Sequence, residues 1–177
     1  PPAIAFAPTD PAEVATLLHA ADEAGLAVAP LGARTATALG RPLARYDVAL
    51  DLRGLDRVIE YVPEDLVITT QAGVTLRTLQ TTLHEHGQYL SVDPPPGDEV
   101  TVGGMLASAR SGAWRGHLPA ARDLILGMRV ALPSGELVTS GGRVVKNVTG
   151  YDLHRMHTGA LGAFSVIVEA TFKLTPL

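Results

Sequence analysis

The chain contains no cysteine in its 177 residues. This absence excludes disulfide bonds, iron–sulfur clusters held by thiolates, and attachment of a cofactor through sulfur. A chain of this length can bury a full hydrophobic core without such cross-links. Any group that the protein binds is therefore held without sulfur chemistry.

An excess of basic residues and long apolar runs are also lacking. The 14 lysines and arginines are outnumbered by 18 aspartates and glutamates, giving a net charge of −4, whereas a nucleic-acid-binding surface is normally basic. No uninterrupted apolar segment approaches the roughly 20 residues of a membrane-spanning helix. A signal-type basic segment followed by an apolar one is absent as well, which favours a cytoplasmic location.

Patterns for metal binding and catalysis are scarce. His84 and His86 stand two residues apart near a predicted helix end, so they face different directions and do not indicate a metal site. His154 and His157 would share a helix face, but no acidic cluster accompanies them, and we predict structural roles for both. His117 favours the role of a polar loop residue. The sequence thus predicts no metal ion and identifies no catalytic residue.

Helical and strand patterns alternate along the chain and predict a mixed α+β fold. Thr9-Asp-Pro begins a helix over residues 12–24, and Gly25 ends it. The prolines of Pro94–Gly97 predict a rigid connection between a first lobe of about residues 1–92 and a second of about 98–177. Further helices are predicted at Leu76–His86 and Thr101–Ala109, and strands at Leu26–Leu31, Val48–Leu50, Val58–Val62, Leu66–Gln71, Leu124–Leu132, Leu137–Thr139 and Phe164–Leu174.

Three segments rich in small residues lie at the ends of predicted elements. Pro30–Thr37 offers successive backbone N–H groups after a strand, which is the geometry of an anion nest. Taken alone it favours a simple surface loop, because it lacks both a Walker lysine and the spacing of a nicotinamide-binding Rossmann turn. Thr101–Gly104 and Gly159–Gly162 allow close approach of the backbone to a bulky group, although tight turns would explain them equally well. The three together indicate one large shared ligand.

Nine segments in a fixed order resemble the FAD-binding domain of the vanillyl-alcohol oxidase/p-cresol methylhydroxylase (PCMH-type) superfamily, and within it the FAD-binding subunits of bacterial glycolate oxidases. They are Pro30–Thr35, Asp51-Leu52 with Leu55 and Val58, Gln71–Leu76, Thr101–Gly104, Arg122-Asp123 with Leu126-Gly127, Leu132–Glu136, Lys146-Asn147, Gly150–Leu153 and Gly159–Gly162. The resemblance covers nearly the whole chain and implies a PCMH-type fold of two α+β lobes with FAD between them.

The resemblance also implies roles for particular residues. In the family the first loop holds the pyrophosphate, and a second stretch lines the ribityl chain and the flavin. A third, Leu161–Ile167 here, brings backbone against the other side of the cofactor, where the adenine end and the ring amides need partners. The corresponding residues are Pro30, Leu31, Gly32, Ala33, Arg34 and Thr35; then Thr101, Gly103, Gly104, Ser108, Ser111 and Gly112; and then Gly162 and Ile167. The first loop contains no His, Cys or Tyr, the residues that attach flavin covalently in some members, so we expect noncovalent FAD.

Two functions remain open. The resemblance implies an oxidoreductase component that passes electrons from a 2-hydroxy acid such as glycolate, through FAD, to partner subunits. In the family a second domain follows and supplies most substrate contacts, and this chain stops near the point where that domain would begin. The alternative is a module that holds FAD, or has lost it, and serves mainly in assembly. The loops at Pro30 and Thr101 favour the first; the missing domain and Gly162-Ala-Phe-Ser165, where many relatives read Gly-Thr-Leu-Gly, favour the second.

Overall fold

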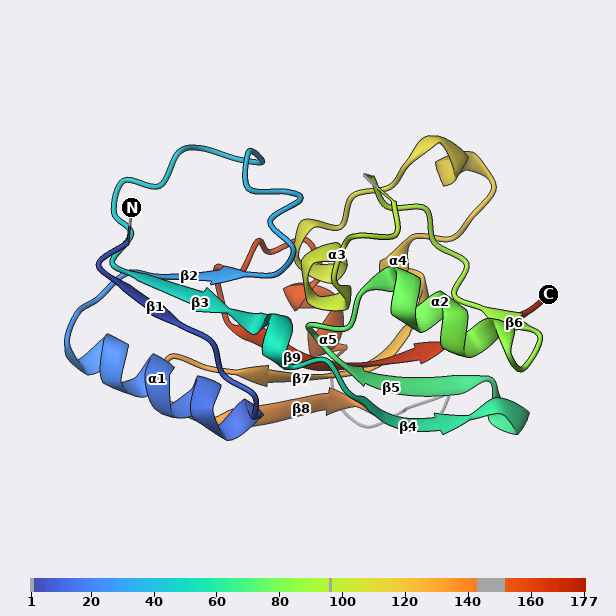
Figure 1. The fold of residues 1–177 in the computed structure, drawn as a ribbon, viewed down its shortest axis with the longest axis horizontal. Coiled ribbons are helices and arrows are strands. Elements are labelled where there is room, and N and C mark those ends of the chain that lie inside the picture. Colours follow the sequence, from blue (N-terminus) through green and yellow to red (C-terminus); the bar gives the residue numbers. More distant parts are fainter. Residues whose placement is uncertain (1, 96, 143–151) are drawn as a thin grey trace.

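The computed structural model describes residues 2–95, 97–142 and 152–177. It contains a three-stranded and a five-stranded sheet, with helices packed against both (Figure 1). The predicted mixed α+β class is confirmed. None of the helices that the structure describes has the length and apolar character of a transmembrane span.

The smaller sheet is parallel, in the order β1-β3-β2. Its strands are β1 (Ile4–Phe6), β2 (Val28–Leu31) and β3 (Val48–Asp51), and helix α1 (Pro11–Glu23) connects the first two. Asp10 caps α1, because its Oδ1 accepts a hydrogen bond of 2.7 Å from the Ala12 N–H. The helix therefore begins within one residue of its predicted start.

The larger sheet is antiparallel, in the order β4-β5-β9-β7-β8. Its strands are β4 (Val58–Val62), β5 (Val67–Gln71), β7 (Ile125–Ala131), β8 (Leu137–Gly141) and β9 (Val166–Lys173). β9 is the central strand, and its residues alternate between two cores: Ile167, Ala170 and Phe172 contribute to one, and Val166 and Val168 to the other. The sheet therefore separates the two apolar cores of the molecule.

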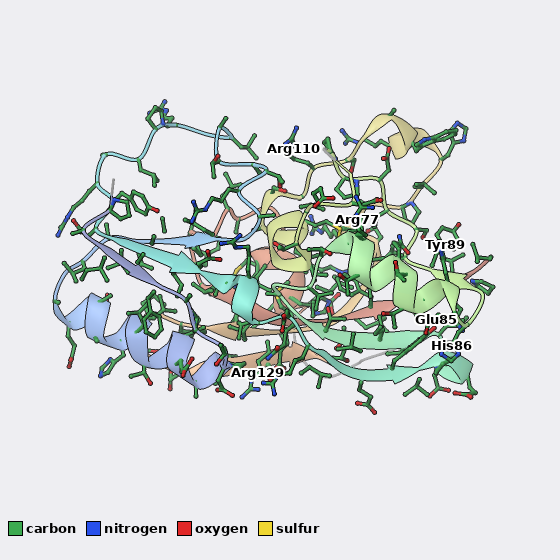
Figure 2. The ribbon with its side chains drawn as sticks, in the orientation of Figure 1. Arg77, Glu85, His86, Tyr89, Arg110 and Arg129 are labelled. Carbon is green, nitrogen blue, oxygen red and sulfur yellow. The ribbon has the colours of Figure 1, made fainter. Side chains whose placement is uncertain are left out.

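Different helices cover the two faces of the five-stranded sheet. α2 (Leu76–His84) and α3 (Val102–Ser108) bury Leu79, Leu83 and Leu106 in the larger core. On the opposite face α1 packs on β7 and β8, and Arg129 of β7 projects there, away from α2, to pair with Glu169 of β9 at 3.3 Å (Figure 2). The short helix α4 (Ala121–Leu124) directly precedes the β7–β8 hairpin, and the short helix α5 (Leu153–His157) follows it in the chain.

The predicted lobe boundary at Pro94–Gly97 requires correction. β4 and β5 precede it in sequence, yet β5 pairs with β9 over its whole length. The chain crosses between the sheets earlier, in the segment from the 3₁₀ turn η1 (Leu52–Gly54) to Val58. One lobe is thus the three-stranded sheet with α1, and the other is the five-stranded sheet with α2 and α3. Proline content marks a rigid connection, but it does not reveal which distant strands will pair.

Smaller differences occur at element ends. The predicted strand Leu124–Leu132 begins one residue later, at Ile125, because Leu124 ends the short helix α4, and it ends one residue earlier, at Ala131. The structure adds β1 and a pairing of β6 (Gln88–Tyr89) with β10 (Thr175–Pro176) that the sequence did not predict. The remaining short elements are the 3₁₀ turns η2 (Pro63–Asp65) and η3 (Ala113–Gly116).

Candidate cofactor-binding site

A cleft of about 970 Å³ lies between the two lobes. Its volume is at the upper end of the range of roughly 300–1,000 Å³ that is usual for ligand sites. One wall is β2 with the loop that follows it, and the other comprises α3, the end of α5 and the start of β9. The predicted site residues that line it are Pro30, Leu31, Gly32, Ala33, Arg34, Thr35, Thr101, Gly103, Gly104, Ser108, Gly162 and Ile167.

The loop after β2 lies against the start of α3. A Cβ atom on Gly32 would stand 2.2 Å from the Thr101 Oγ1, so only glycine permits this approach. Within the described part of the chain, the structure gives no protein acceptor to the backbone N–H groups of Ala33, Arg34 and Thr35. These residues line an open cleft, so this row of N–H groups is available to an anion.

Cationic side chains accompany these donors. Among the described residues that line the cleft, Arg34 and Arg41 are positively charged and none carries a carboxylate. Arg34 has a left-handed backbone with φ of 61°, and its guanidinium lies 3.8 Å from the Asp51 carboxylate. The Arg53 side chain, hydrogen-bonded to Asp51, holds the pKa of that carboxyl below its usual value, and Arg34 adds to the effect. The cleft is therefore suited to an anionic ligand although the whole chain is acidic.

Helix α3 positions the opposite wall. Thr101 caps it, and the Thr101 Oγ1 accepts a 3.2 Å hydrogen bond from the Gly104 N–H. Gly103 faces Ala72, whose Cβ would be 2.8 Å from a Cβ at this position. The Ser108 hydroxyl donates to the Gly104 carbonyl at 2.8 Å. These glycines and hydroxyls thus also have structural roles within the wall.

The segment before β9 closes the cleft on its other side. Gly162 has φ of 79°, and a Cβ there would lie 2.9 Å from the Pro30 Cγ, which brings the two walls into direct contact. Ile167 lines the cleft and is almost wholly buried. Leu161 has a left-handed φ of 53° without being glycine. Such strained backbone is concentrated at functional sites in general.

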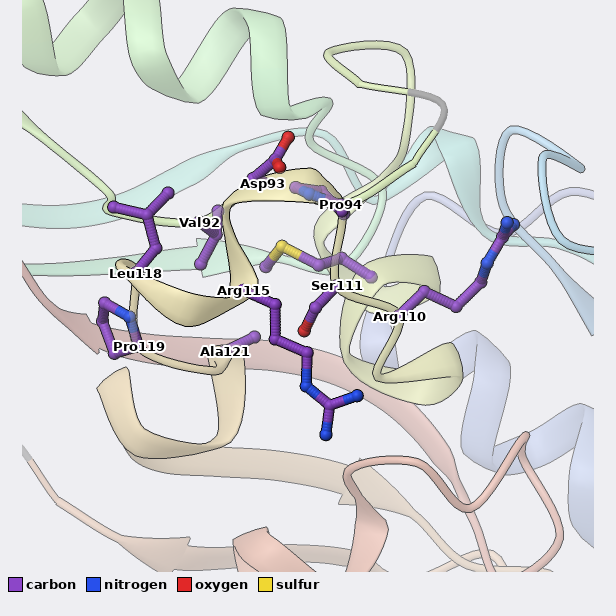
Figure 3. A pocket seen from close by; sticks show the side chains of 11 residues that line it. Val92, Asp93, Pro94, Arg110, Ser111, Arg115, Leu118, Pro119 and Ala121 are labelled. Atoms are coloured by element: carbon purple, nitrogen blue, oxygen red, sulfur yellow. The ribbon is translucent and has the colours of Figure 1, made fainter.

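Ser111 and Gly112 lie apart from this cleft. They line a second pocket of about 10 Å³, which has room for a single water molecule at most (Figure 3). The Gly112 N–H donates to the Asp93 carbonyl, and the Trp114 N–H donates to the Asp93 Oδ2 at 2.9 Å. The loop after α3 therefore folds toward Asp93. Of the motif at Lys146–Leu153, residues 146–151 lie outside the described residues.

His157 was not predicted at the site, but the structure places it in the cleft wall. Its Nδ1 lies 2.8 Å from the Ser165 Oγ, and both residues line the cleft. His154, one turn earlier, is buried against Ser140 and lies outside the cleft. The one sequence signal for His157 was its position two residues before the Gly159–Gly162 segment.

The two buried histidines predict a pH dependence of stability. Burial lowers the pKa of both His154 and His157, so the unfolded chain binds protons that the folded chain does not. We expect the free energy of unfolding to be flat above the ordinary histidine pKa and to fall as the pH drops below about 6.5, by up to about 1.4 kcal/mol per pH unit for each group. Urea unfolding across this range measures the slope.

A doubly substituted chain with His154→Asn and His157→Gln should lose most of that slope. The exposed Met156 on the same helix provides the control, because Met156→Gln removes no titratable group and should leave the slope unchanged. A stability that rises as the pH falls through this range would contradict the prediction.

The sequence of the chain matches a known family and several known proteins. Residues 2–141 match the family described as "FAD binding domain". The chain is 38% identical over 146 residues to glycolate oxidase subunit GlcE of Escherichia coli, covering 82% of this chain and 41% of that protein. It is 31% identical over 174 residues to the mitochondrial D-lactate dehydrogenase [cytochrome] of Arabidopsis thaliana, covering 98% of this chain and 30% of that protein. The chain thus spans less than half the length of these relatives.

Solved structures agree with this relationship. A structure of alkyldihydroxyacetonephosphate synthase superimposes with a TM-score of 0.81 at 25% identity, covering 97% of this chain and 34% of that one. The cleft fits FAD in volume, and its free N–H groups and arginines suit a pyrophosphate. Its largely apolar lining suits flat rings. The chain therefore belongs to the family of FAD binding domains, and FAD is its cofactor.

Proposed function

We propose that this chain is the cofactor-holding part of an oxidoreductase acting on 2-hydroxy acids, with FAD bound noncovalently between its lobes. The row of backbone N–H groups without protein acceptors at Ala33, Arg34 and Thr35 carries the proposal. These groups bind the pyrophosphate, Arg34 and Arg41 neutralise its charge, and Gly32 allows the loop to approach Thr101.

The chain positions the cofactor and keeps water from it. The wall formed by α3 and β9 presents small and apolar side chains, among them Ala107, Ala163 and Val166, along the length of the ligand. When bound, FAD supplies the hydride and electron transfer that no side chain can perform. This chain's own contribution is binding, orientation and the electrostatic environment of the cofactor.

The relatives support the substrate class. Glycolate, D-lactate and D-2-hydroxyglutarate appear in their names, and each is a carboxylate with a hydroxyl on the adjacent carbon. The name of the subunit from Escherichia coli describes one part of an assembly. We therefore propose that electrons leave this chain for partner subunits. The free N–H groups in a cation-lined cleft favour a chain that holds FAD over one that has lost it.

The test begins with the absorbance spectrum of the protein purified without added cofactor. We expect flavin bands, and after denaturation the flavin should pass through a filter that retains the chain, because no covalent link holds it. In the assembly with the substrate-contacting domain and partner subunits, glycolate or D-lactate added without oxygen should bleach the visible band, whereas acetate, which has no hydroxyl, should not. A colourless protein that also fails to bind added FAD would contradict the proposal and favour an assembly module.

A further inference from the structure

The connection from β2 to β3 is long and irregular. It comprises residues 32–47, and none of these 16 residues forms a helix or a strand. Neighbouring parallel strands are usually joined through a helix, and loops of more than about 12–15 residues without secondary structure are commonly lids or binding loops. In Figure 1 the connection, in light blue, arches away from the three-stranded sheet as it returns from the end of β2 to the start of β3. Residues 32–43 all line the cleft, so a segment of the length of a lid borders the cofactor site.

The two ends of this connection are fixed. At the first end Gly32 lies against the start of α3, and the Arg34 guanidinium is 3.8 Å from the Asp51 carboxylate. At the second end the Asp47 Oδ2 accepts a 2.7 Å hydrogen bond from the Ala27 N–H, and the Asp47 N–H donates to the Ala27 carbonyl at 3.0 Å. Any movement is therefore confined to the residues between these two ends.

The middle of the connection is loosely held. In the part of the chain that it describes, the structure records no backbone hydrogen bond for residues 40–46, and residues 37–45 are all exposed. Leu39 and Leu43 are 44% and 66% exposed although both are apolar. Segments with few buried contacts and few hydrogen bonds open and close most easily. Residues 36–46, which we call the lid segment, therefore have the freedom to move.

The facing wall offers a fixed apolar surface. Leu161, on the segment before β9, is 52% exposed and lines the cleft. Its N–H donates to the Ala107 carbonyl, which ties this wall to α3. The lid segment already reaches the wall at Gly40, where a Cβ would lie 3.8 Å from the Leu161 Cδ1. Leu39 adjoins this contact and Leu43 follows it, so closure at this point removes apolar surface from water on both sides of the cleft.

We propose that the lid segment closes over bound FAD, with Leu39 and Leu43 packing on Leu161. The inference rests on the proposed function, because FAD between the lobes is the group that the lid segment covers. FAD enters the open cleft, and the middle of the connection then folds down while its two ends stay in place. Closure excludes water from the cofactor and slows its release. The leucines that are exposed in the open form are buried in the closed one.

Proteolysis with and without FAD tests the closure. Chymotrypsin should cut the unsubstituted chain after Leu43 and trypsin should cut it after Arg45, because both bonds lie in the exposed lid segment. Saturating FAD should slow both cleavages by about 10-fold or more. Cleavage after Arg115, in the exposed turn η3, is the control and should continue at the same rate. Equal cleavage after Arg45 with and without FAD would overturn the proposal, and so would an equal slowing after Arg115, which would reflect stabilisation of the whole chain.

The rate of FAD release separates a moving lid from a rigid wall. It is measured by flavin fluorescence after dilution of the loaded chain. Leu43→Ser and Leu161→Asn should each speed release by about 10-fold, the effect expected for one buried leucine; asparagine tolerates the left-handed backbone of residue 161. The double variant should release FAD little faster than either single variant, because both substitutions remove the same contact. Leu177→Ser, which alters an exposed leucine outside the cleft, should release FAD at the unsubstituted rate.

The possible outcomes separate the two proposals. Unchanged release from Leu43→Ser and Leu161→Asn, with the fold intact by circular dichroism, would overturn this inference alone. Release that is about 100-fold faster in the double variant would also overturn it, because the two leucines would then act on FAD independently. Failure of the unsubstituted chain to bind FAD at all would overturn the proposed function and this inference with it.

Discussion

Gly32→Ala is expected to weaken FAD binding by roughly 10- to 100-fold, since overpacking costs about 1–3 kcal/mol. The added Cβ would stand 2.2 Å from the Thr101 Oγ1, and it would push the loop with its free N–H groups away from α3. Gly32 does not have a positive φ, so the expected effect comes from the collision and not from backbone strain. Titration with FAD measures the loss.

A second substitution, Thr101→Ala, tests whether contact with the Thr101 side chain causes the loss of affinity. In a Thr101→Ala background the nearest remaining atom would be the residue 101 Cβ, at 3.3 Å, so Gly32→Ala should cost far less there. Thr101→Ala alone should cost about 1 kcal/mol of stability because it removes a helix cap. Gly116→Ala is the matched control, since no atom lies within 4 Å of a Cβ at that position. Equal losses of affinity from Gly32→Ala in the two backgrounds would show that contact with Thr101 does not explain the requirement for glycine.

Phe172→Ala is expected to lower the free energy of unfolding by about 3–5 kcal/mol. Phe172 is fully buried on the central strand β9, between Ile68 of β5 and Ile125 of β7. Its removal leaves a cavity at the centre of the larger core, which cannot collapse because strands lie on both sides. For a chain of this size we expect the melting temperature to fall by roughly 6–20 °C.

Urea unfolding of both phenylalanine variants checks this expectation. Phe164 is 55% exposed, so Phe164→Ala should change stability by less than about 0.5 kcal/mol. Similar losses for the two substitutions would contradict the assignment of Phe172 to the core. Added FAD should raise the stability of both variants by mass action if the cleft binds it.

Local signals in the sequence located most of the elements. The Asp10 cap and the proline after it set the start of α1, because both act within one turn of the helix. The β-branched run at Val67–Gln71 is the strand β5 that the sequence predicts. The three segments rich in small residues also converge on one cleft, as expected for a shared ligand.

The features that the sequence did not predict depend on contacts between segments far apart in the chain. β1 is three exposed residues long and is a strand because β3, more than forty residues later, pairs with it. Ser111 and Gly112 belong to the loop that bonds to Asp93, a residue in the chain before α3. Neither the pairing of β1 with β3 nor the contact of this loop with Asp93 can be predicted from the residues adjacent in sequence.

The sequence by itself determined the α+β class, the absence of sulfur chemistry and the small-residue loops that admit a bulky cofactor, because each depends on residue type or short-range spacing. Only the tertiary structure decided which strands join into the five-stranded sheet, where the two lobes divide, and that His157 and Ser165 meet in the cleft wall. Those features depend on contacts between segments far apart in the chain, and such contacts form only when the apolar faces of whole elements pack together.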